Sequence, residues 1–477
     1  MSYEVVIGLE VHLQLKTRTK AFCGCSTEFG AEPNSQVCPV CLGFPGSLPV
    51  FNLTALDYGI KVALALNCTI QEHTKFDRKN YFYPDLPKAY QISQYDLPLS
   101  KNGHIDVELK QGPKRVGITR VHMEEDAGKL IHQDDYSCVD YNRTGIPLLE
   151  IVSEPDIRSP EEAYQYLVTL KSIIAYLDVS DCDMEKGSLR CDANISLRPA
   201  GQIELGTKTE LKNLNSFKAV KDALNFEIMR QTQALDGGVK ILQETRLWDE
   251  KVQQTISMRT KEGAQDYRYF PEPDLPEIKI TQEKINEVKS SLPELPHEKM
   301  LRFTKEYGLS VYDAGILVYS KADASYAEEC MKAYFSKDKK AVANWFNGAL
   351  LSEANARNSS LSGLKVAAAN LIELIGYVDR EEISNLTAKV VLTEMIDTKK
   401  TAGTIIKEKS LIQISDTGAL DKIARQIIEE NPKSVADFKT GKNNALMFLV
   451  GQVMRKSGGK ANPKVVQEVL KGRLTNA

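Results

Sequence analysis

The chain has 477 residues, of which 42% are hydrophobic and 26% are charged, and its formal net charge is −3. This composition is typical of an ordinary soluble protein, and the absence of any apolar run long enough to cross a bilayer argues against a membrane protein. The length exceeds what one hydrophobic core serves, so we expect roughly two to four domains. The first residues have neither a basic signal-peptide start nor an Arg-rich leader, which predicts a cytoplasmic protein.

Charge is spread unevenly along the chain. Residues 401–477 contain 13 Lys and Arg against 7 Asp and Glu, a net of +6, and the rest of the chain carries −9. A basic tail on an acidic body suggests contact with a polyanion. The alternative is a solvated helical surface with no partner.

Residues 5–15 alternate between apolar and polar side chains, as a β-strand does. Side chains two apart share a face, so Glu10 and His12 point together at one spot. The two could be metal ligands, or they could lie at a solvated strand edge.

Four cysteines follow in the spacing C-x-C…C-x-x-C. Two tight turns would bring their thiolates together, and four thiolates suit tetrahedral Zn²⁺. A redox dithiol would favour a C-x-x-C beside a βαβ unit, which the sequence does not contain. We therefore predict a structural Zn²⁺ site that leaves no open coordination position, formed by Cys23, Cys25, Cys38 and Cys41.

A basic and aromatic segment begins at Phe76 and reads F-D-R-K-N-Y-F-Y-P-D-L-P-K. Its prolines make a long helix improbable. Arg78 and Lys79 among several aromatic side chains suit contact with a nucleotide or nucleic acid. An ordered loop packed on the core is the alternative.

The stretch from His122 to Asp156 is rich in carboxylates, which lie beside two apolar, strand-like runs at 116–121 and 146–152. Burying carboxylates is costly unless a cation or a donor compensates each one. We therefore predict a site for a hard cation here, with a solvated acidic loop as the alternative. The acidic residues are Glu124, Glu125, Asp126, Glu150, Glu154 and Asp156.

The rest of the N-terminal part mixes strands with helices, and the C-terminal part is helical. Ser159 and Pro160 predict the start of a helix at 160–178, and a second helix is expected at about 216–235. Beyond residue 296, helical patterns lie at 297–307, 310–318, 323–335, 338–353, 361–375 and 379–397, with a break near 401–410. Four more helices are expected at about 418–430, 434–439, 443–456 and 462–473.

Two absences restrict the chemistry. The sequence has no P-loop motif for ATP. It also has no G-x-S-x-G elbow and no Ser-rich amidase stretch. The chain therefore lacks a visible ammonia-releasing hydrolase of its own.

Several runs of the sequence match motifs of one family. They are I-G-L-E-V-H at 7–12, F-D-R-K-N-Y-F-Y-P-D-L-P-K at 76–88, H-M-E-E-D-A-G-K at 122–129, I-V-S-E-P-D at 151–156, G-S-L-R-C-D-A-N at 187–194, K-N-L-N-S-F at 212–217, D-Y-R-Y-F-P-E-P-D-L-P at 266–276, F-L-V-G-Q-V-M at 448–454 and G-K-A-N-P at 459–463. On these motifs the chain closely resembles the B subunits of the bacterial aspartyl/glutamyl-tRNA amidotransferases.

The resemblance implies an α+β fold. An N-terminal cradle domain on a mixed or antiparallel sheet would be followed by an all-α helical domain and a small all-α tail domain. Together with the breaks in composition, this places the domains at 1–292, 293–407 and 408–477. The zinc cysteines are present in some members of the family and replaced in others, so they are not essential to its chemistry.

The resemblance also implies a reaction. The B subunit would use ATP to activate the side chain of Glu misacylated on tRNA(Gln), or of Asp misacylated on tRNA(Asn), and ammonia would then displace phosphate. The amidase-like glutaminase of the complex, its A subunit, would supply the ammonia, and a small C subunit would complete a heterotrimer. Which of the two tRNAs is the natural substrate stays open. A non-catalytic tRNA-binding scaffold is the alternative function.

For this reaction we predict a Mg²⁺ that holds the ATP phosphates, since phosphoryl transfer depends on neutralising charge. Glu10, His12, Glu125 and Glu150 are the expected ligands, with Glu124 as the competitor of Glu125 because alternation aims only one of them inward. Lys79 and Arg78 are the candidates for contact with ATP. The residues expected to contact tRNA in the tail are Arg455, Lys456 and Lys460.

Overall fold

The computed structural model describes residues 2–260, 267–413, 417–440, 442–457 and 461–475. The chain divides into two compact units, Met1–Pro296 and His297–Ala477. The first unit combines a large sheet with helices, and the described residues of the second are helical, which confirms the α+β fold class. The finer division into three domains stays a prediction. Among the described residues, no helix combines the length and apolarity needed to cross a membrane.

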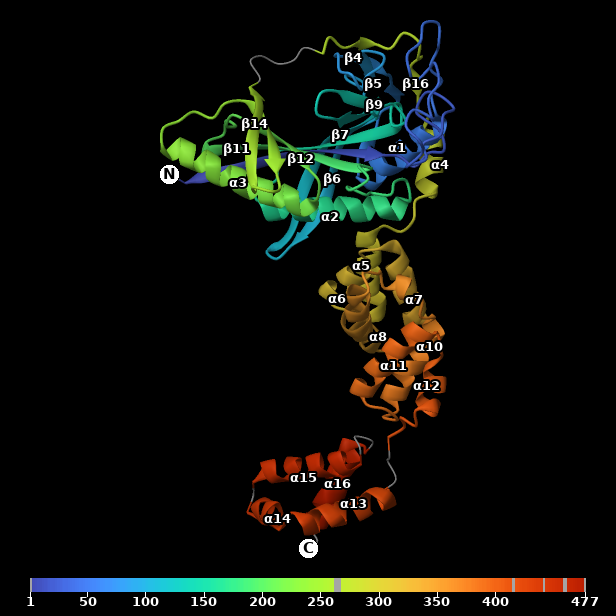
Figure 1. Ribbon diagram of the computed structural model, residues 1–477, viewed down its shortest axis with the longest axis vertical. Coiled ribbons are helices and arrows are strands. Elements are labelled where there is room, and N and C mark those ends of the chain that lie inside the picture. Colours follow the sequence, from blue (N-terminus) through green and yellow to red (C-terminus); the bar gives the residue numbers. More distant parts are fainter. Residues whose placement is uncertain (1, 261–266, 414–416, 441, 458–460, 476–477) are drawn as a thin grey trace. The chain divides into compact units, whose positions relative to one another are not determined.

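A nine-stranded sheet forms the centre of the first unit, in the order β14-β13-β12-β11-β1-β10-β7-β6-β2 (Figure 1). Neighbouring strands are antiparallel except for β12 and β13, which are parallel. The strands are β1 (Tyr3–Gln14), β2 (Thr69–Ile70), β6 (Ser100–Leu109), β7 (Gly112–Glu125), β10 (Pro147–Ser153), β11 (Leu189–Pro199), β12 (Thr209–Leu214), β13 (Glu244–Asp249) and β14 (Gln254–Thr260).

The sheet buries its apolar face against helices α1 (Leu53–Ala65), α2 (Pro160–Leu177) and α3 (Phe217–Asp236). The odd-numbered residues of β1 from Ile7 to Leu13 are buried in this core, and the even-numbered ones face the other side, so the predicted alternation is confirmed. Ser159 accepts a hydrogen bond from the Glu162 amide and caps α2 with Pro160 in its first turn, as expected.

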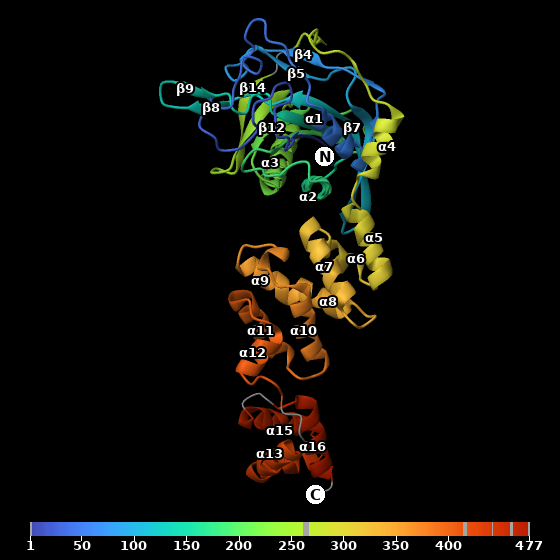
Figure 2. The same ribbon diagram turned by 90° about the vertical axis from the view of Figure 1, so that its right-hand side faces the viewer.

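Smaller elements cover the opposite side of the sheet, where β4 and β5 lie in both views (Figures 1 and 2). A three-stranded sheet has the order β15-β4-β5. Strands β16 and β3 form a second small sheet, and β8 and β9 a hairpin. These elements, with the last helix of the unit, are β3 (His73–Thr74), β4 (Asp77–Asn80), β5 (Tyr90–Ser93), β8 (Lys129–His132), β9 (Ser137–Asp140), β15 (Phe270–Pro271), β16 (Ile278–Lys279) and α4 (Gln282–Ser290).

The second unit departs from the predicted boundaries in two places. The predicted segments 361–375 and 379–397 fold as a 3₁₀ turn (Ser362–Leu364), α10 (Ala368–Asp379) and α11 (Asn385–Thr398), and Ser384 caps α11. The expected break at 401–410 contains a short helix, α12 (Ala402–Glu408), which Thr401 caps. In both places a capping side chain, rather than apolar periodicity, sets where the helix begins.

The helices of this unit are α5 (Pro296–Tyr307), α6 (Val311–Leu317), α7 (Lys321–Ala333), α8 (Lys340–Trp345), a π-helical turn η1 (Phe346–Leu350), α9 (Leu351–Ala356), a 3₁₀ turn η2 (Ser362–Leu364), α10 (Ala368–Asp379), α11 (Asn385–Thr398), α12 (Ala402–Glu408), α13 (Thr417–Glu430), α14 (Pro432–Lys439), α15 (Asn443–Lys456) and α16 (Pro463–Thr475). The last four have a hydrophobic core of their own, which includes Leu449, Val453 and Leu470.

Candidate active site

The register of four strands assembles a polar face on the sheet. His12 in β1 is directly opposite Glu150 in β10, and Glu150 is opposite His122 in β7. On its other side, His12 is opposite Arg190 in β11. Because directly opposed residues of antiparallel strands point to the same face, these side chains form a row across the sheet. Residues from distant parts of the sequence thus meet above β1.

Two of these side chains form a compact group of metal-ligand type together with Glu124 of β7. One ligand atom each from His12, Glu124 and Glu150 lie within 4.8 Å of one another. The His12 Nε2 atom is 3.6 Å from a carboxylate oxygen of each glutamate. Both carboxylates are buried, at 4% and 9% exposure, so their charges need compensation. An imidazole and two carboxylates in this arrangement suit a hard divalent cation.

Neighbouring side chains already act on this group. The His122 Nε2 atom lies 3.2 Å from a Glu150 oxygen. Burial by itself would raise the pKa of the Glu150 carboxyl, but the interactions with His122, which include a hydrogen bond, and those with His12 and Lys79 outweigh burial and lower it. Glu150 therefore stays a carboxylate and is available to a cation.

Glu10 lies one pleat further along β1, beside this group. Its carboxylate accepts a hydrogen bond of 2.9 Å from the Asn194 side-chain amide. Burial, followed by the charge of Glu150, raises the pKa of Glu10. On the neighbouring strands β11 and β12, the Lys212 Nζ atom is 2.8 Å from a carboxylate oxygen of Asp192. Glu10 borders the three-residue group without belonging to it.

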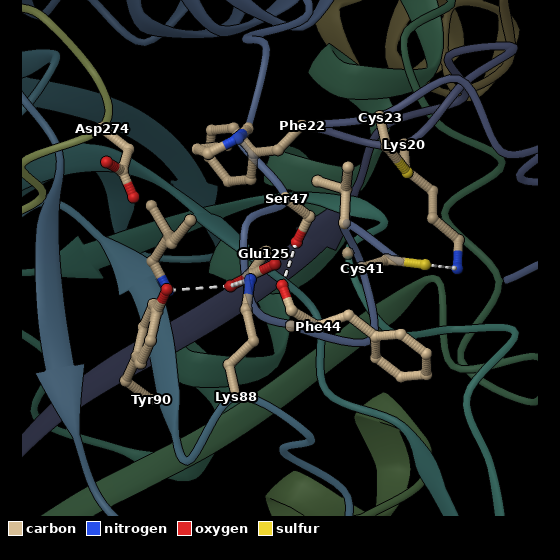
Figure 3. Close-up of a pocket in the computed structure, with 15 residues that line it drawn as sticks. Lys20, Phe22, Cys23, Cys41, Phe44, Ser47, Lys88, Tyr90, Glu125 and Asp274 are labelled. Carbon is tan, nitrogen blue, oxygen red and sulfur yellow. Dashed lines mark hydrogen bonds and ion pairs between the residues drawn. The ribbon is translucent and has the colours of Figure 1, made fainter. Parts of the chain in front are cut away.

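Glu125 faces the other side of β7. Its carboxylate accepts a hydrogen bond of 2.9 Å from the Ile92 amide and forms an ion pair with Lys88. It lines a cavity of about 130 Å³ that also contains Lys20 and Cys41, and Figure 3 shows Lys88 directed at Glu125. Alternation along β7 thus brings Glu124, and not Glu125, to His12 and Glu150.

The two basic residues of β4 have different surroundings. Lys79 Nζ lies 4.9 Å from the centre of the Tyr267 ring and has no carboxylate within 4.0 Å among the described residues. Its charge contributes to the lowered pKa of Glu150, so it lies close enough to act on that carboxylate. Arg78 instead donates two hydrogen bonds of 2.7 and 2.8 Å to Glu272. The structure brings Lys79 to the site, whereas Arg78 is engaged in an internal ion pair.

Sequence reasoning missed several residues of this face. Arg190 and Lys212 lie on it, and Asp126, which was counted only among the acidic residues, is buried and bound to Arg190. Alternation in the run R-C-D-A-N at 190–194 was the available signal, because it places Arg190, Asp192 and Asn194 on one face.

The four cysteines of the N-terminal loops come together. One sulfur atom from each lies within 4.8 Å of the others, and the Cys38 and Cys41 sulfurs are 3.9 Å apart. Tetrahedral Zn²⁺ with bonds of about 2.3 Å would space its ligands about 3.8 Å apart, so the group fits this ion. Lys20 Nζ is 3.7 Å from the Cys41 sulfur. A hydrogen bond from Cys23, the Cys38 backbone and the Lys20 charge together lower the pKa of Cys41 to about 4, against the effect of burial.

The basic residues of the tail lie at the end of α15. Arg455 and Lys456 are both exposed, and Lys456 Nζ forms a 2.7 Å ion pair with Glu430. Lys460 lies outside the described residues. Of the pair that the structure describes, Arg455 is the one without an internal carboxylate partner.

Known proteins of similar sequence identify the family. Residues 5–286 match the family described as "GatB/GatE catalytic domain", and residues 325–474 match "GatB domain". The chain is 56% identical to the B subunit of the aspartyl/glutamyl-tRNA(Asn/Gln) amidotransferase of Carboxydothermus hydrogenoformans, over 99% of both chains. It is 53% identical to that of Brevibacillus brevis, over 98% of this chain and 99% of the relative. The chain belongs to this family of amidotransferase B subunits.

The cysteine group yields a test of its metal. Replacing Cys38 by Ser should abolish zinc binding and lower the free energy of unfolding by at least about 2 kcal/mol, because the metal ties two loops together. Metal analysis and thermal unfolding of the purified protein measure both effects. Cys138→Ser is the matched control, since Cys138 is exposed and outside the group. Wild-type protein that contains no zinc would refute the assignment.

Proposed function

We propose that this chain is the ATP-using subunit of a tRNA-dependent amidotransferase. It activates the side-chain carboxylate of Glu misacylated on tRNA(Gln), of Asp misacylated on tRNA(Asn), or of both. The names of its relatives, which specify amidotransferase subunits for these tRNAs, support the substrate class. The observation that carries the ATP-dependent step is the group of His12, Glu124 and Glu150 beside Lys79.

The proposed metal is Mg²⁺, held by His12, Glu124 and Glu150. Neighbouring ligands of octahedral Mg²⁺ lie about 3 Å apart, given metal–oxygen distances of about 2.1 Å. The observed separations are 3.6 Å from His12 Nε2 to each carboxylate, so the side chains would need to close by only about half an ångström around the ion. The ion would neutralise charge on the phosphates of ATP. Glu10, one pleat away, would bind a water molecule coordinated to the ion, or would itself supply a further oxygen ligand.

The chemistry requires activation because a carboxylate is a poor electrophile. A carboxylate oxygen of the aminoacyl group attacks the γ-phosphorus of ATP, and the bond from that phosphorus to ADP breaks. Ammonia then attacks the carbonyl carbon of the acyl phosphate, inorganic phosphate leaves, and a proton is released to give the amide. The first step is governed by position and charge neutralisation, and Lys79 supplies a fixed cation beside the metal-ligand group.

Ammonia would come from partners. The sequence contains no motif of a glutamine-hydrolysing enzyme, and the names of its relatives designate them as B subunits, which supports an assembly with other chains. The proposed partners are a glutaminase of the amidase type together with a small third subunit in a heterotrimer. A scaffold that only binds tRNA would be a simpler role, but it has no use for two buried carboxylates aimed at one histidine.

Two further parts have separate proposed roles. Zn²⁺ at the cysteine group would be structural, because four thiolates leave no open position. The tail would bind the body of the tRNA through exposed cations such as Arg455. Recognition would depend mostly on shape, as is usual for folded RNA.

Glu124→Gln tests the proposed metal site. Loss of one charged ligand should lower the rate of tRNA-dependent ATP hydrolysis and of amide formation by about 10²-fold or more. Glutamine hydrolysis by the partner glutaminase, measured without tRNA, should persist. ATP hydrolysis and amide formation are measured on the purified complex with misacylated tRNA.

Glu154→Gln is the matched control for Glu124→Gln. Glu154 belongs to the same acidic stretch, but its carboxylate accepts a hydrogen bond from Thr119 and lies outside the metal-ligand group. The control should keep near-normal amidation. Wild-type rates of ATP hydrolysis in Glu124→Gln would disprove the site.

Reversing one charge tests the tail. Arg455→Glu should raise the KM for misacylated tRNA and flatten the dependence of tRNA affinity on salt, because one phosphate contact is lost. The KM for ATP should not change. Lys305→Glu is the control, because Lys305 is exposed on α5 and the substitution changes the net charge equally. If both variants bind tRNA like the wild type, the basic tail is only a solvated surface.

A further inference from the structure

Arg190 lies on the polar face of the sheet, directly opposite His12 in the register of β11 and β1. Burial would lower its pKa, but the carboxylate of Asp126, followed by the charges of Glu124 and Asp192, raises it. The guanidinium is therefore close to the metal-ligand group and stays charged. Its side chain is 34% exposed, so part of it is open to a ligand.

A buried carboxylate fixes the position of this guanidinium. Asp126 is 2% exposed and accepts hydrogen bonds from Arg190 Nη2 at 2.9 Å and from Gln14 Nε2 at 2.6 Å. Arg143 also lies beside Asp126, with its Nε atom 3.7 Å from a carboxylate oxygen. Asp126 engages only the Nη2 atom of Arg190, and in the described part of the chain the Nε and Nη1 atoms have no hydrogen-bond partner. Arg190 is thus held in place, and its Nε and Nη1 donors are available to a ligand.

The surroundings of Arg190 differ from those of Lys79. Lys79 has no carboxylate within 4.0 Å in the described structure, lies over the Tyr267 ring and is near enough to influence Glu150, which suits a phosphate beside the metal. Arg190 presents a planar fork, which matches the geometry of a carboxylate. The two cations are therefore suited to the two different anions of the reaction, the phosphate and the side chain of the amino acid.

The position of Arg190 along the strands fits in-line transfer. A cavity of about 260 Å³ lies at the Gly8 end of β1 and is bordered by Glu10, Ser153 and Asn194. Arg190 lies toward the opposite end, where Gln14 contacts Asp126. Arg190 itself is in register with His12 and Glu150, and its guanidinium extends toward Asp126, beside the metal-ligand group. In phosphoryl transfer, the attacking and leaving oxygens lie on opposite sides of the phosphorus, so a nucleotide held in the cavity at the Gly8 end would leave the side of the Arg190 guanidinium to the attacking carboxylate.

We propose that Arg190 binds and aims the side-chain carboxylate of the aminoacyl group, and that Asp126 and Gln14 are positioning residues that hold its guanidinium. This inference rests on the proposed function. The carboxylate oxygen that Arg190 aims attacks the γ-phosphorus as the bond to ADP breaks. When ammonia has replaced the phosphate, the product is a neutral amide that no longer pairs with Arg190. The same residue therefore selects the substrate and favours release of the product.

The test compares the affinity of the complete complex for a charged substrate and for its amide product. Wild-type enzyme should bind Glu-tRNA(Gln) about 10- to 100-fold more tightly than Gln-tRNA(Gln), the range expected of a charged hydrogen-bonded pair. Asp-tRNA(Asn) and Asn-tRNA(Asn) serve if that is the pair the enzyme converts. In Arg190→Gln this preference should fall to near one, and the KM for ATP should not change.

Two further variants keep the test decisive. Arg190→Lys retains the charge but not the planar fork of the guanidinium, so it should keep only part of the preference. This variant also provides a test if Arg190→Gln folds poorly. Arg198→Gln is the control, because Arg198 lies on the same strand but pairs with Glu4. It should keep the full preference.

The outcomes separate this inference from the proposed function. If Arg190→Gln keeps the preference for the charged substrate, the proposed role of Arg190 is overturned. A variant that keeps the preference but has a raised KM for ATP would show that Arg190 is instead a phosphate ligand. A wild-type enzyme with tRNA-dependent ATP hydrolysis but no preference also overturns the inference alone. Failure of the wild type to hydrolyse ATP with misacylated tRNA would instead refute the proposed function.

Discussion

The burial of Glu124 and Glu150 beside His12 is the constraint on which the rest of the site depends. Two carboxylates this close and this far from water repel each other, and removing them from water costs several kcal/mol each unless cations compensate. The fold supplies part of that compensation through a hydrogen bond from His122 and the charge of Lys79. A divalent cation would complete it. The same balance of charge that stabilises the fold therefore leaves a place for the metal of the reaction.

Strand register is how the chain meets this constraint. Antiparallel pairing of β1 with β10 and β11 brings residues from three distant parts of the sequence into one row. The odd-numbered residues of β1 meanwhile enter the core, so a one-residue slip would turn the polar row into the core. The hydrophobic core thus enforces the geometry of the site, and rigidity there is the condition for aiming a carboxylate at a phosphorus.

Much of this arrangement could be predicted from local patterns. Alternation located β1 and the pairing of Glu10 with His12 on one face, and the cysteine spacing predicted a group that the structure brings together. Which of Glu124 and Glu125 faces His12 could not be predicted, because that depends on the phase of β7 relative to β10. Arg78 and Lys79 are adjacent and equally charged, and only the position of Glu272 in the fold separates their roles. Arg190 was missed because its partner Asp126 lies 64 residues away.

The decisive measurement is the position of a bound metal in the complete complex. Crystals grown with Mn²⁺ in place of Mg²⁺ and a non-hydrolysable ATP analogue would locate the ion by its anomalous scattering. We predict a peak within about 2.3 Å of His12 Nε2 and of one oxygen each from Glu124 and Glu150. A peak bound instead by Glu125, or no peak at these three side chains while the analogue is bound, would contradict the proposed site.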